Sequence, residues 1–263
     1  MSYHYFNTVP VAAHRGNAKY FPENTLAAFR SALSLSPDML ETDLHMTSDG
    51  EIVIMHDHLV DRTTNGSGLV REKTYEQIRK LDAGSWKGEQ FIGEKVPNFA
   101  EFLELTANVP NLLFNIELKD YPADSGDFAY RSADKAIAMM KAAGIFERSV
   151  VNTWSGELNE YLVRTYDGIR IHAYYPQERM GLRQTRYVFD YAFCVCLFGT
   201  HEAPVVDKKV FDLCKAYGAE PWVYFKEDTP ELYDAALANG ARLFTSNDPA
   251  WAMEYLRTKG LHH

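Results

Sequence analysis

The sequence predicts an α/β fold of the TIM (β/α)₈ barrel type, and two observations support this class. Short apolar segments of strand character alternate eight times with amphipathic helical segments along the 263-residue chain, which is the pattern of a closed parallel barrel. An open doubly wound sheet is the alternative. The first strand, however, is not followed by the Gly-x-Gly-x-x-Gly motif of the dinucleotide-binding form of that sheet. We therefore expect residues 1–263 to form a single barrel domain.

Each expected strand is a short run rich in apolar and β-branched residues. The strands are expected at residues 10–14, 38–45, 111–118, 148–152, 169–173, 190–197, 220–225 and 242–245. A segment with apolar residues at helical spacing follows each of them, directly or after an interruption. The helices are expected at residues 24–35, 98–107, 128–143, 156–166, 178–186, 204–217, 229–239 and 249–258.

Local signals mark the ends of some of these helices. In the first, Leu26, Phe29 and Leu33 recur at helical spacing, and Asn24 stands where an N-cap residue is expected. Gly144 follows the third expected helix directly, and glycine at this position is a common C-terminal signal.

Two stretches interrupt the alternation of strands and helices. Within residues 39–57, Asp49 and Gly50 separate two strand-like runs, which predicts a tight hairpin. Residues 57–96 are polar and contain several glycines. Because this stretch is too long for an ordinary barrel loop, we expect it to form a small insertion over the mouth of the barrel.

Composition narrows the classes of function. A formal net charge of −9 argues against a nucleic-acid-binding surface, which needs basic residues. No run of apolar residues is long enough to span a membrane, and the first ten residues lack the features of a secretory signal. The cysteines form neither a disulfide framework nor a CxxC metal motif; they are Cys194, Cys196 and Cys214. We expect free thiols and a cytoplasmic protein, and the sequence does not indicate an oligomeric state.

Carboxylates stand on two of the expected barrel strands. Glu41 and Asp43 are two residues apart, so both side chains point to the same face of their strand. Glu117 and Lys119 share a face of the next barrel strand, with Asn115 two residues earlier. Polar residues at the carboxyl ends of barrel strands are typical of active sites in this fold. Three carboxylates together favour a hard divalent cation such as Mg²⁺ or Ca²⁺.

Two histidines are candidates to join these carboxylates. His14 and Arg15 stand at the exit of the first strand, which neighbours the second strand in a closed barrel. If Asp49 and Gly50 form a two-residue turn, His56 lies directly opposite Asp43, although a slip of one residue would reverse its face. For the other histidines considered we expect structural or surface roles; they are His4, His45, His58, His172 and His201.

Six sequence motifs together resemble those of the glycerophosphodiester phosphodiesterase family. They follow one another in order through nearly the whole first half of the chain. The motifs are AHRG (13–16), PENT (22–25), ETD (41–43), TSDGEIVIMHD (47–57), DRTTNGSG (61–68) and FNIELK (114–119).

The resemblance implies a TIM barrel with a small insertion after the His-Asp motif, a divalent metal site and hydrolysis of glycerophosphodiesters to an alcohol and a glycerol phosphate. It also implies the roles of particular residues. Glu41, Asp43 and Glu117 match the metal carboxylates. His14 and His56 match the acid–base histidines, and Arg15 and Lys119 match the residues that bind the phosphate. Within PENT, Glu23 is a candidate to orient Arg15, and Asn24 has the same local interpretation as a helix cap.

Physical chemistry leaves parts of this reaction open. We assign His14 as base and His56 as acid, but the sequence does not decide between the two assignments. The nucleophile is either the neighbouring glycerol hydroxyl, which would give a cyclic phosphate, or a water molecule. A phospholipase-like enzyme acting on lysophospholipid or inositol lipid is the alternative function, and a non-catalytic barrel that binds phosphorylated ligands is a third. Candidate aromatic residues for an apolar rim are Trp86, Phe91, Tyr174, Tyr175, Tyr224 and Phe225.

The second half of the chain departs from the family pattern in two places. One late strand often ends Trp-Thr-Val-Asn in the family, whereas this chain has WVYFKED at residues 222–228. The last strand commonly ends Thr-Asp before a proline, whereas here the sequence is FTSNDP at residues 244–249. These departures leave the preferred alcohol undetermined.

Overall fold

The computed structural model describes residues 5–263 and contains a closed barrel of eight parallel strands. Closure comes from the first strand, β1, which pairs with both β2 and β9. The open-sheet alternative is therefore wrong. The barrel strands are β1 (Val11–Ala13), β2 (Met39–Met46), β4 (Leu113–Leu118), β5 (Ser149–Asn152), β6 (Ile171–Tyr175), β7 (Ala192–Leu197), β8 (Glu220–Tyr224) and β9 (Leu243–Ser246).

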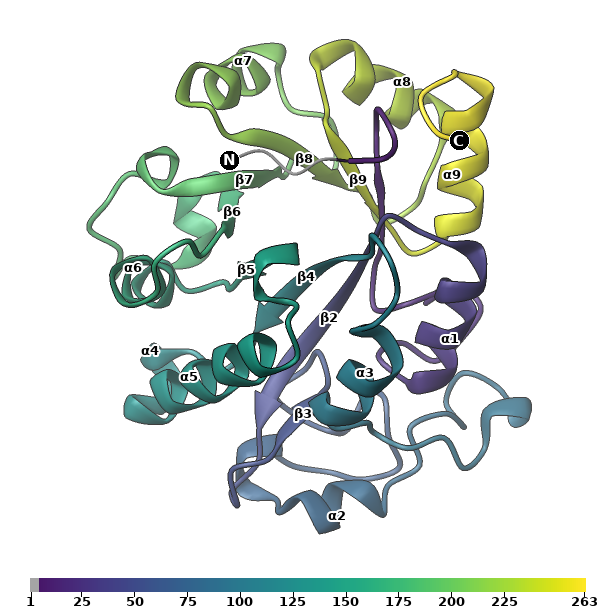
Figure 1. Cartoon of the computed structure of the whole chain (residues 1–263), viewed down its shortest axis with the longest axis vertical. Helices are drawn as coiled ribbons and strands as arrows, with labels where there is room; N and C mark the ends of the chain where they lie inside the picture. Colours follow the sequence, from purple (N-terminus) through teal and green to yellow (C-terminus); the bar gives the residue numbers. More distant parts are fainter. Residues whose placement is uncertain (1–4) are drawn as a thin grey trace.

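The α-helices lie outside the strands, which occupy the centre of the view in Figure 1. Side chains between the helices and the strands form the largest apolar core of the described residues. Most of the helices begin at a side-chain cap of the kind the sequence suggests, such as Thr229 and Asp248, each followed by proline. The helices packed around the barrel are α1 (Leu26–Leu35), α3 (Phe99–Thr106), α4 (Pro122–Ser125), α5 (Asp127–Ala142), α6 (Gly156–Thr165), α7 (Lys208–Tyr217), α8 (Pro230–Asn239) and α9 (Pro249–Thr258).

The helix expected at residues 178–186 is wrong. This segment instead contains a short 3₁₀ turn, η4 (Gln177–Met180), and a second turn, η5 (Val188–Asp190), follows it. Gly181 ends the first turn with φ +81°, a conformation that interrupts a helix. Leu182 is 91% exposed, so the segment has no continuous apolar stripe to bury against the barrel.

The cap expected for the first helix is also wrong, by one residue. The N-cap of α1 is Thr25, whose Oγ1 accepts a hydrogen bond from Ala28 N at 3.2 Å. Asn24 has φ +60°, which directs its side chain toward the barrel. Its Nδ2 donates to Asp43 Oδ2 at 2.7 Å. A residue that looks like a helix cap in the sequence thus belongs to the site.

The hairpin after β2 forms, but with a register one residue different from the one expected. Strand β3 (Ile52–Ile54) pairs antiparallel with β2, and the turn covers residues 47–51 rather than two residues. Met55 N donates to Asp43 O at 3.0 Å, so Asp43 lies opposite Met55 and not opposite His56. Since β3 ends at Ile54, strand alternation no longer determines the direction of His56, which still lines the site cavity.

The expected insertion at residues 57–96 is present, and its apolar side chains form a cluster with Val53 and Met55 of the hairpin. It carries the short helix α2 (Tyr75–Arg79), which lies at the bottom of Figure 1 below β3 and α3. Thr74 and Gln77 form a capping box at the start of α2. The insertion is thereby packed as a unit beside the barrel mouth. The buried members of the cluster are Val53, Met55, Val60, Val70, Ile78, Ala83 and Val96.

The inside of the barrel changes from apolar to polar along its axis. The end of the barrel interior at which the strands begin is filled by a second apolar cluster. Two residues further along several of the same strands, polar side chains face the cavity at the carboxyl ends. Within residues 5–263 no helix combines the length and apolarity needed to cross a bilayer. The buried members of the second apolar cluster are Ala12, Met39, Leu113, Val150, Cys194, Trp222 and Leu243.

Candidate active site

The structure brings the candidate residues of the first half together at the carboxyl ends of the strands. A cavity of about 120 Å³ opens there. His14 and Arg15 follow β1, Glu41 comes from β2, Glu117 comes from β4, and His56 comes from the start of the insertion. The convergence expected from strand order is confirmed, even though the hairpin register on which one step relied is not.

Three carboxylates form the acidic centre of this site. Glu41, Asp43 and Glu117 each place a carboxylate oxygen within 4.8 Å of the others. The pairing of β2 with β4 explains the geometry, because Asp43 is in register with Glu117. All three residues are at most 6% exposed. Buried carboxylates this close together need positive charge between or beside them.

The charges on the protein leave room for a divalent cation. Glu41 Oε1 is buried without a hydrogen-bond partner among the described residues. Burial, followed by the charge of Asp43, raises the pKa of Glu41 well above its usual value. Five carboxylates around the cavity face three cationic side chains, which leaves an excess of two negative charges when all five are ionised. The carboxylates are those of Glu23, Glu41, Asp43, Asp57 and Glu117, and the cations are Arg15, Arg62 and Lys119. A buried, all-oxygen donor set with this excess fits a divalent metal ion.

Lys119 lies among the carboxylates. Its Nζ is 3.2 Å from Asp43 Oδ1 and also contacts Glu117 Oε1. Burial lowers the pKa of Lys119, but the charges of Asp43 and Glu117 raise it by more, so it stays protonated. Burial likewise raises the pKa of Asp43, whereas Lys119, Arg15 and His56 together hold it well below its usual range. Asp43 is therefore ionised while Glu41 is the carboxylate that lacks compensation.

Arg15 is held by acidic residues on two sides. Its Nη1 donates to Glu23 Oε1 at 2.9 Å, and its Nε lies 3.2 Å from Asp43 Oδ2. Its backbone N donates to Glu41 Oε2 at 2.8 Å. The expectation that Glu23 orients Arg15 is consistent with this geometry. Arg15 has φ +54°, a costly conformation for a non-glycine residue, and such strain is characteristic of functional sites.

Gly16 makes the bend after Arg15 possible. It has φ +83°, and a Cβ atom at this position would lie 2.7 Å from the backbone carbonyl carbon of Ala28. Neither the conformation nor the space admits a side chain. The third residue of the His-Arg-Gly triplet therefore allows the loop after β1 to pack against helix α1.

The ring orientation of His14 is determined by a residue from the other end of the chain. Its Nδ1 lies 2.7 Å from Asn247 Oδ1, and the centroid of its ring lies 4.8 Å from the ring centroid of Tyr224. Because an amide oxygen only accepts, Nδ1 carries the proton and Nε2 is left as an acceptor. That Nε2 lies 3.9 Å from Glu41 Oε2. Burial, followed by the charge of Arg15, lowers the pKa of His14 to about 3, so the ring is neutral.

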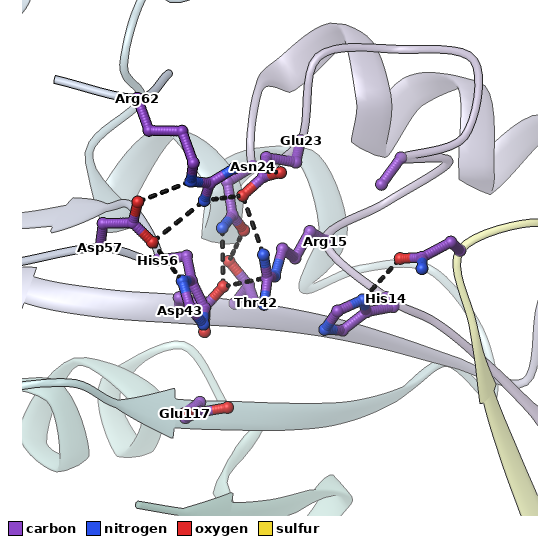
Figure 2. A network of polar contacts seen from close by, with 12 residues as sticks. His14, Arg15, Glu23, Asn24, Thr42, Asp43, His56, Asp57, Arg62 and Glu117 are labelled. Atoms are coloured by element: carbon purple, nitrogen blue, oxygen red, sulfur yellow. Dashed lines mark hydrogen bonds and ion pairs between the residues drawn. The ribbon is translucent and has the colours of Figure 1, made fainter. Parts of the chain in front are cut away.

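His56 is oriented in a similar way, but by a carboxylate. Its Nδ1 lies 2.5 Å from Asp57 Oδ1, and Asp57 is bound in turn by Arg62 through Nε and Nη2. Arg62 also donates to both carboxylate oxygens of Glu23. Figure 2 shows this chain of contacts, which runs from His56 through Asp57, Arg62 and Glu23 to Arg15. Burial lowers the pKa of His56, against the opposing effect of Asp43.

Two of these supporting residues could not be assigned from the sequence. Arg62 lies in the DRTTNGSG motif, and this membership of a motif was the available signal. Asn247 lies in the FTSNDP stretch that departs from the family pattern. It also donates from Nδ2 to Tyr224 Oη at 3.3 Å. One departure from the family pattern therefore supplies the partner of His14.

The far wall of the cavity comes from the second half of the chain. Tyr174 and Tyr224 line it, as do Trp154 and Phe198, which were not singled out from the sequence. Tyr174 Oη donates to Glu117 Oε2 at 3.1 Å, and Trp154 stacks on Tyr174 with the ring centroids 4.2 Å apart. The other candidate rim aromatics do not line this cavity; they are Trp86, Phe91, Tyr175 and Phe225.

The remaining histidines considered lie in different surroundings. His45 is buried, with Nδ1 2.9 Å from Asp120 Oδ1, and His58 packs against it outside the cavity. His201 is exposed, and His4 lies outside the described residues. These three described positions fit the expected structural or surface roles. His172 is also buried and hydrogen-bonded, as a structural role implies, and it lines the cavity beside Asn115 and Asn152. The three cysteines are free and buried, as expected.

Comparison with known proteins identifies the family. The model of the glycerophosphoryl diester phosphodiesterase family matches residues 14–224. A glycerophosphodiester phosphodiesterase of Caldanaerobacter subterraneus subsp. tengcongensis is 36% identical over 235 residues, which cover 89% of this chain and 83% of that protein. The chain belongs to the glycerophosphoryl diester phosphodiesterase family. A second relative, the glycerophosphodiester phosphodiesterase of Bacillus subtilis, is 41% identical over 119 residues, or 42% of this chain and 41% of the relative.

Two solved structures share the fold of this chain. A glycerophosphodiester phosphodiesterase from Agrobacterium tumefaciens superposes with a TM-score of 0.73 at 23% identity, covering 92% of this chain and 97% of that one. An Oleispira antarctica phosphodiesterase in complex with its product sn-glycerol-3-phosphate superposes with a TM-score of 0.77 at 20% identity, covering 94% and 96%. The barrel class expected from the sequence is thus confirmed.

Proposed function

We propose that this chain is a metal-dependent enzyme that hydrolyses glycerophosphodiesters to an alcohol and sn-glycerol 3-phosphate. One observation carries the proposal. His14 and His56 both line the cavity beside the carboxylates, and each has its Nδ1 held by an acceptor, Asn247 Oδ1 at 2.7 Å or Asp57 Oδ1 at 2.5 Å. Each ring is therefore left with Nε2 for the substrate. Membership of the family, with the names of the relatives described above, supports the same activity.

The metal proposed is Mg²⁺ or Ca²⁺, held by Glu41, Asp43 and Glu117. Both ions prefer oxygen ligands, and no cysteine or histidine takes part in the acidic cluster found among residues 5–263. A divalent ion bound there would neutralise charge on the phosphodiester and polarise its oxygens. Asp43 is ionised in the protein as it stands, whereas Glu41 has an unpartnered oxygen. We therefore expect ion binding to change the protonation and contacts of Glu41 more than those of Asp43.

The two histidines have partners suited to opposite roles. Asn247 is a neutral partner, so it orients His14 without favouring a charged ring, which suits a base that removes a proton from the nucleophile. Asp57 is a charged partner, and its hydrogen bond favours the protonated form of His56, against burial. That form suits the acid that gives a proton to the departing alcohol. A positioned acid or base contributes roughly 10²–10⁴-fold to such a reaction.

Arg15 and Lys119 are proposed to bind the phosphate oxygens. Glu23 and Asp43 occupy Nη1 and Nε of Arg15, and within residues 5–263 its Nη2 makes no hydrogen bond. Lys119 lies at the boundary of a second, larger cavity that it shares with His56. Fixed cations of this kind stabilise charge that shifts among the phosphate oxygens in the transition state. Glu23, Asn24 and Asn115 are proposed to support this arrangement.

The direct test is hydrolysis of glycerophosphocholine and other glycerophosphodiesters by the purified chain. We expect activity that a chelator abolishes and that added Mg²⁺ or Ca²⁺ restores. His14→Ala and His56→Ala should each lower kcat by roughly 10²–10⁴-fold, whereas His201→Ala, at an exposed position, should not. Full activity in both of the first two variants, or activity indifferent to chelation, would sink the proposal. Trapping of a cyclic phosphate would identify the glycerol hydroxyl as the nucleophile.

We also propose that the chain is cytoplasmic and acts on a small molecule. The three free cysteines are all buried, which agrees with a reducing compartment such as the cytoplasm. The net charge of −9 still predicts that the chain does not bind nucleic acid, and the proposed partner is the small-molecule substrate.

A further inference from the structure

A layer of three amide and imidazole side chains lies inside the barrel beside the carboxylates, with Asn115 in register with Glu41 and Asn152 in register with Glu117. Asn115 comes from β4, Asn152 from β5 and His172 from β6, and each is at most 3% exposed. Asn152 Nδ2 lies 3.1 Å from Asn115 Oδ1, and His172 Nδ1 lies 3.1 Å from the same oxygen. Polar groups buried this deeply are costly unless they are hydrogen-bonded.

The proton of His172 is assigned from the contacts of its Nδ1. This nitrogen lies 3.1 Å from Asn115 Oδ1, which can only accept, and 3.1 Å from Asn152 Nδ2, which donates to the same oxygen. We assign the hydrogen to Nδ1, because a bare Nδ1 would set its lone pair against that oxygen. His172 is therefore protonated on Nδ1 and has its lone pair on Nε2. Burial lowers the pKa of His172 to about 3, so the ring is neutral.

Two hydrogen-bond acceptors of this layer have no partner. His172 Nε2 and Asn152 Oδ1 are both buried, and neither makes a hydrogen bond with any described residue. Both residues line the same cavity as His14 and Glu117. Leaving such a group unsatisfied is costly, so a ligand that satisfies both of them would bind with a clear advantage.

The chemistry of the two acceptors selects the ligand group. A phosphate oxygen is itself an acceptor and would be repelled by their lone pairs. An ammonium group would be drawn instead to the excess of carboxylates around Glu41. Neutral acceptors without a counter-charge suit a neutral O–H donor. The limited volume of the cavity, about 120 Å³, further favours a small polyol.

We propose that His172 Nε2 and Asn152 Oδ1 form a subsite that accepts hydrogen bonds from the hydroxyl groups of the glycerol portion of the substrate. This inference rests on the proposed function and adds to it the residues that recognise glycerol. A second cavity of about 540 Å³ shares His56 and Trp154 with the first. Its larger size suits the variable alcohol, which leaves the smaller cavity for the constant glycerol.

The test compares two ligands that differ only in their hydroxyl groups, sn-glycerol 3-phosphate and propyl phosphate, by calorimetry on the full chain. Wild-type protein should bind the glycerol compound at least about tenfold more tightly. His172→Phe keeps a ring of similar size but removes the acceptor, so the two affinities should become similar. Asn152→Leu removes the other acceptor and should lower the same ratio, which keeps the proposal testable if one variant does not fold.

The control is Cys194→Ala, at the apolar position on β7 that is in register with His172 on β6. It changes packing next to His172 but keeps both acceptors, so the affinity ratio should stay that of wild type. A folded His172→Phe protein that keeps the wild-type ratio would overturn the subsite, as would a wild-type ratio near one. Failure of the proposed function looks different: the wild-type chain would prefer sn-glycerol 3-phosphate yet hydrolyse no glycerophosphodiester.

Discussion

His14 Nδ1 and Asn247 Oδ1 lie 2.7 Å apart although 233 residues separate them in the sequence. The closure of the barrel makes this contact, because β9 lies beside β1 and Asn247 directly follows β9. The contact leaves His14 Nε2 as the nitrogen that faces Glu41. The first and last strands of the barrel therefore cooperate at one imidazole ring.

Replacing Asn247 should impair catalysis more than binding. In Asn247→Leu the ring of His14 loses the acceptor that determines its tautomer and orientation, and we expect kcat to fall by roughly 10²-fold. Asn247→Asp keeps an acceptor and adds a charge that favours protonated His14. It should retain more activity than Asn247→Leu, but as the pH is lowered its activity should be lost at a higher pH than that of wild type. Steady-state kinetics against pH measure both effects.

The matched control for this prediction is Asn239→Leu. Asn239 donates to Val206 O at 3.1 Å in a part-buried position away from the cavity. Its loss removes one amide hydrogen bond without touching either histidine, so kcat should stay near the wild-type value. Wild-type kcat in Asn247→Leu would show that the tautomer of His14 is immaterial to the reaction.

Arg62 should matter for activity although it lines the second cavity, of about 540 Å³, and not the first, of about 120 Å³. It joins Asp57 of the insertion to Glu23 of the barrel, so Arg62→Ala removes support from both His56 and Arg15. We expect kcat to drop roughly tenfold or more. Arg62→Lys should recover little, because an ammonium group cannot replace the bidentate contacts of a guanidinium.

Lys80→Ala provides the comparison within the same insertion. Lys80 pairs with Glu76 on an exposed helix surface, where its side chain is 71% exposed, and such pairs contribute little. Its kinetics should match the wild-type chain. If Arg62→Ala were as active as Lys80→Ala, the link between the insertion and the site would have no catalytic consequence.

Much of the site could be predicted because its chemistry is encoded locally. Strand alternation places Glu41 and Asp43 on one face, and parallel register then sets Asp43 beside Glu117. Both statements follow from short stretches of sequence and the order of strands in a barrel. Apart from the segment after β6, the strand and helix positions were close to those expected for the same reason.

What could not be predicted depends on long-range or conformational detail. The hairpin register depends on a turn at residues 47–51 that an Asp-Gly pair alone does not reveal. Asn24 looks like a helix cap, and only its φ of +60° shows that its side chain turns to Asp43. For Asn247 and His172 the deciding partners lie on other strands, so no local pattern distinguishes them from ordinary core residues.

Gly16→Ala should destabilise the fold and damage the site. The new methyl group would meet the backbone of Ala28 in addition to requiring a positive φ, so we expect a loss of roughly 2–5 kcal/mol in the free energy of unfolding. Gly50→Ala is the control, since it has φ +86° but open space around it and should cost roughly 1–2 kcal/mol. Urea denaturation compares the two. Equal losses would show that Gly16 is needed only for its backbone conformation.

Replacing His172 should change how stability depends on pH. Burial lowers its pKa in the folded protein to about 3, below the ordinary value of 6.5. The unfolded chain therefore binds the proton more readily than the folded chain. The contribution of the neutral His172 ring to the free energy of unfolding is fully present above pH 6.5 and is lost as the pH falls toward 3. At about pH 5 this loss amounts to about 2 kcal/mol. His172→Phe should therefore lose about 2 kcal/mol less than wild type between pH 7 and 5, measured by urea denaturation at both pH values. His201→Phe removes an exposed histidine instead and should follow the wild-type curve. If His172→Phe lost as much stability as wild type over this range, His172 would not be the buried neutral ring described here, and the acceptor assigned to its Nε2 would lose its basis.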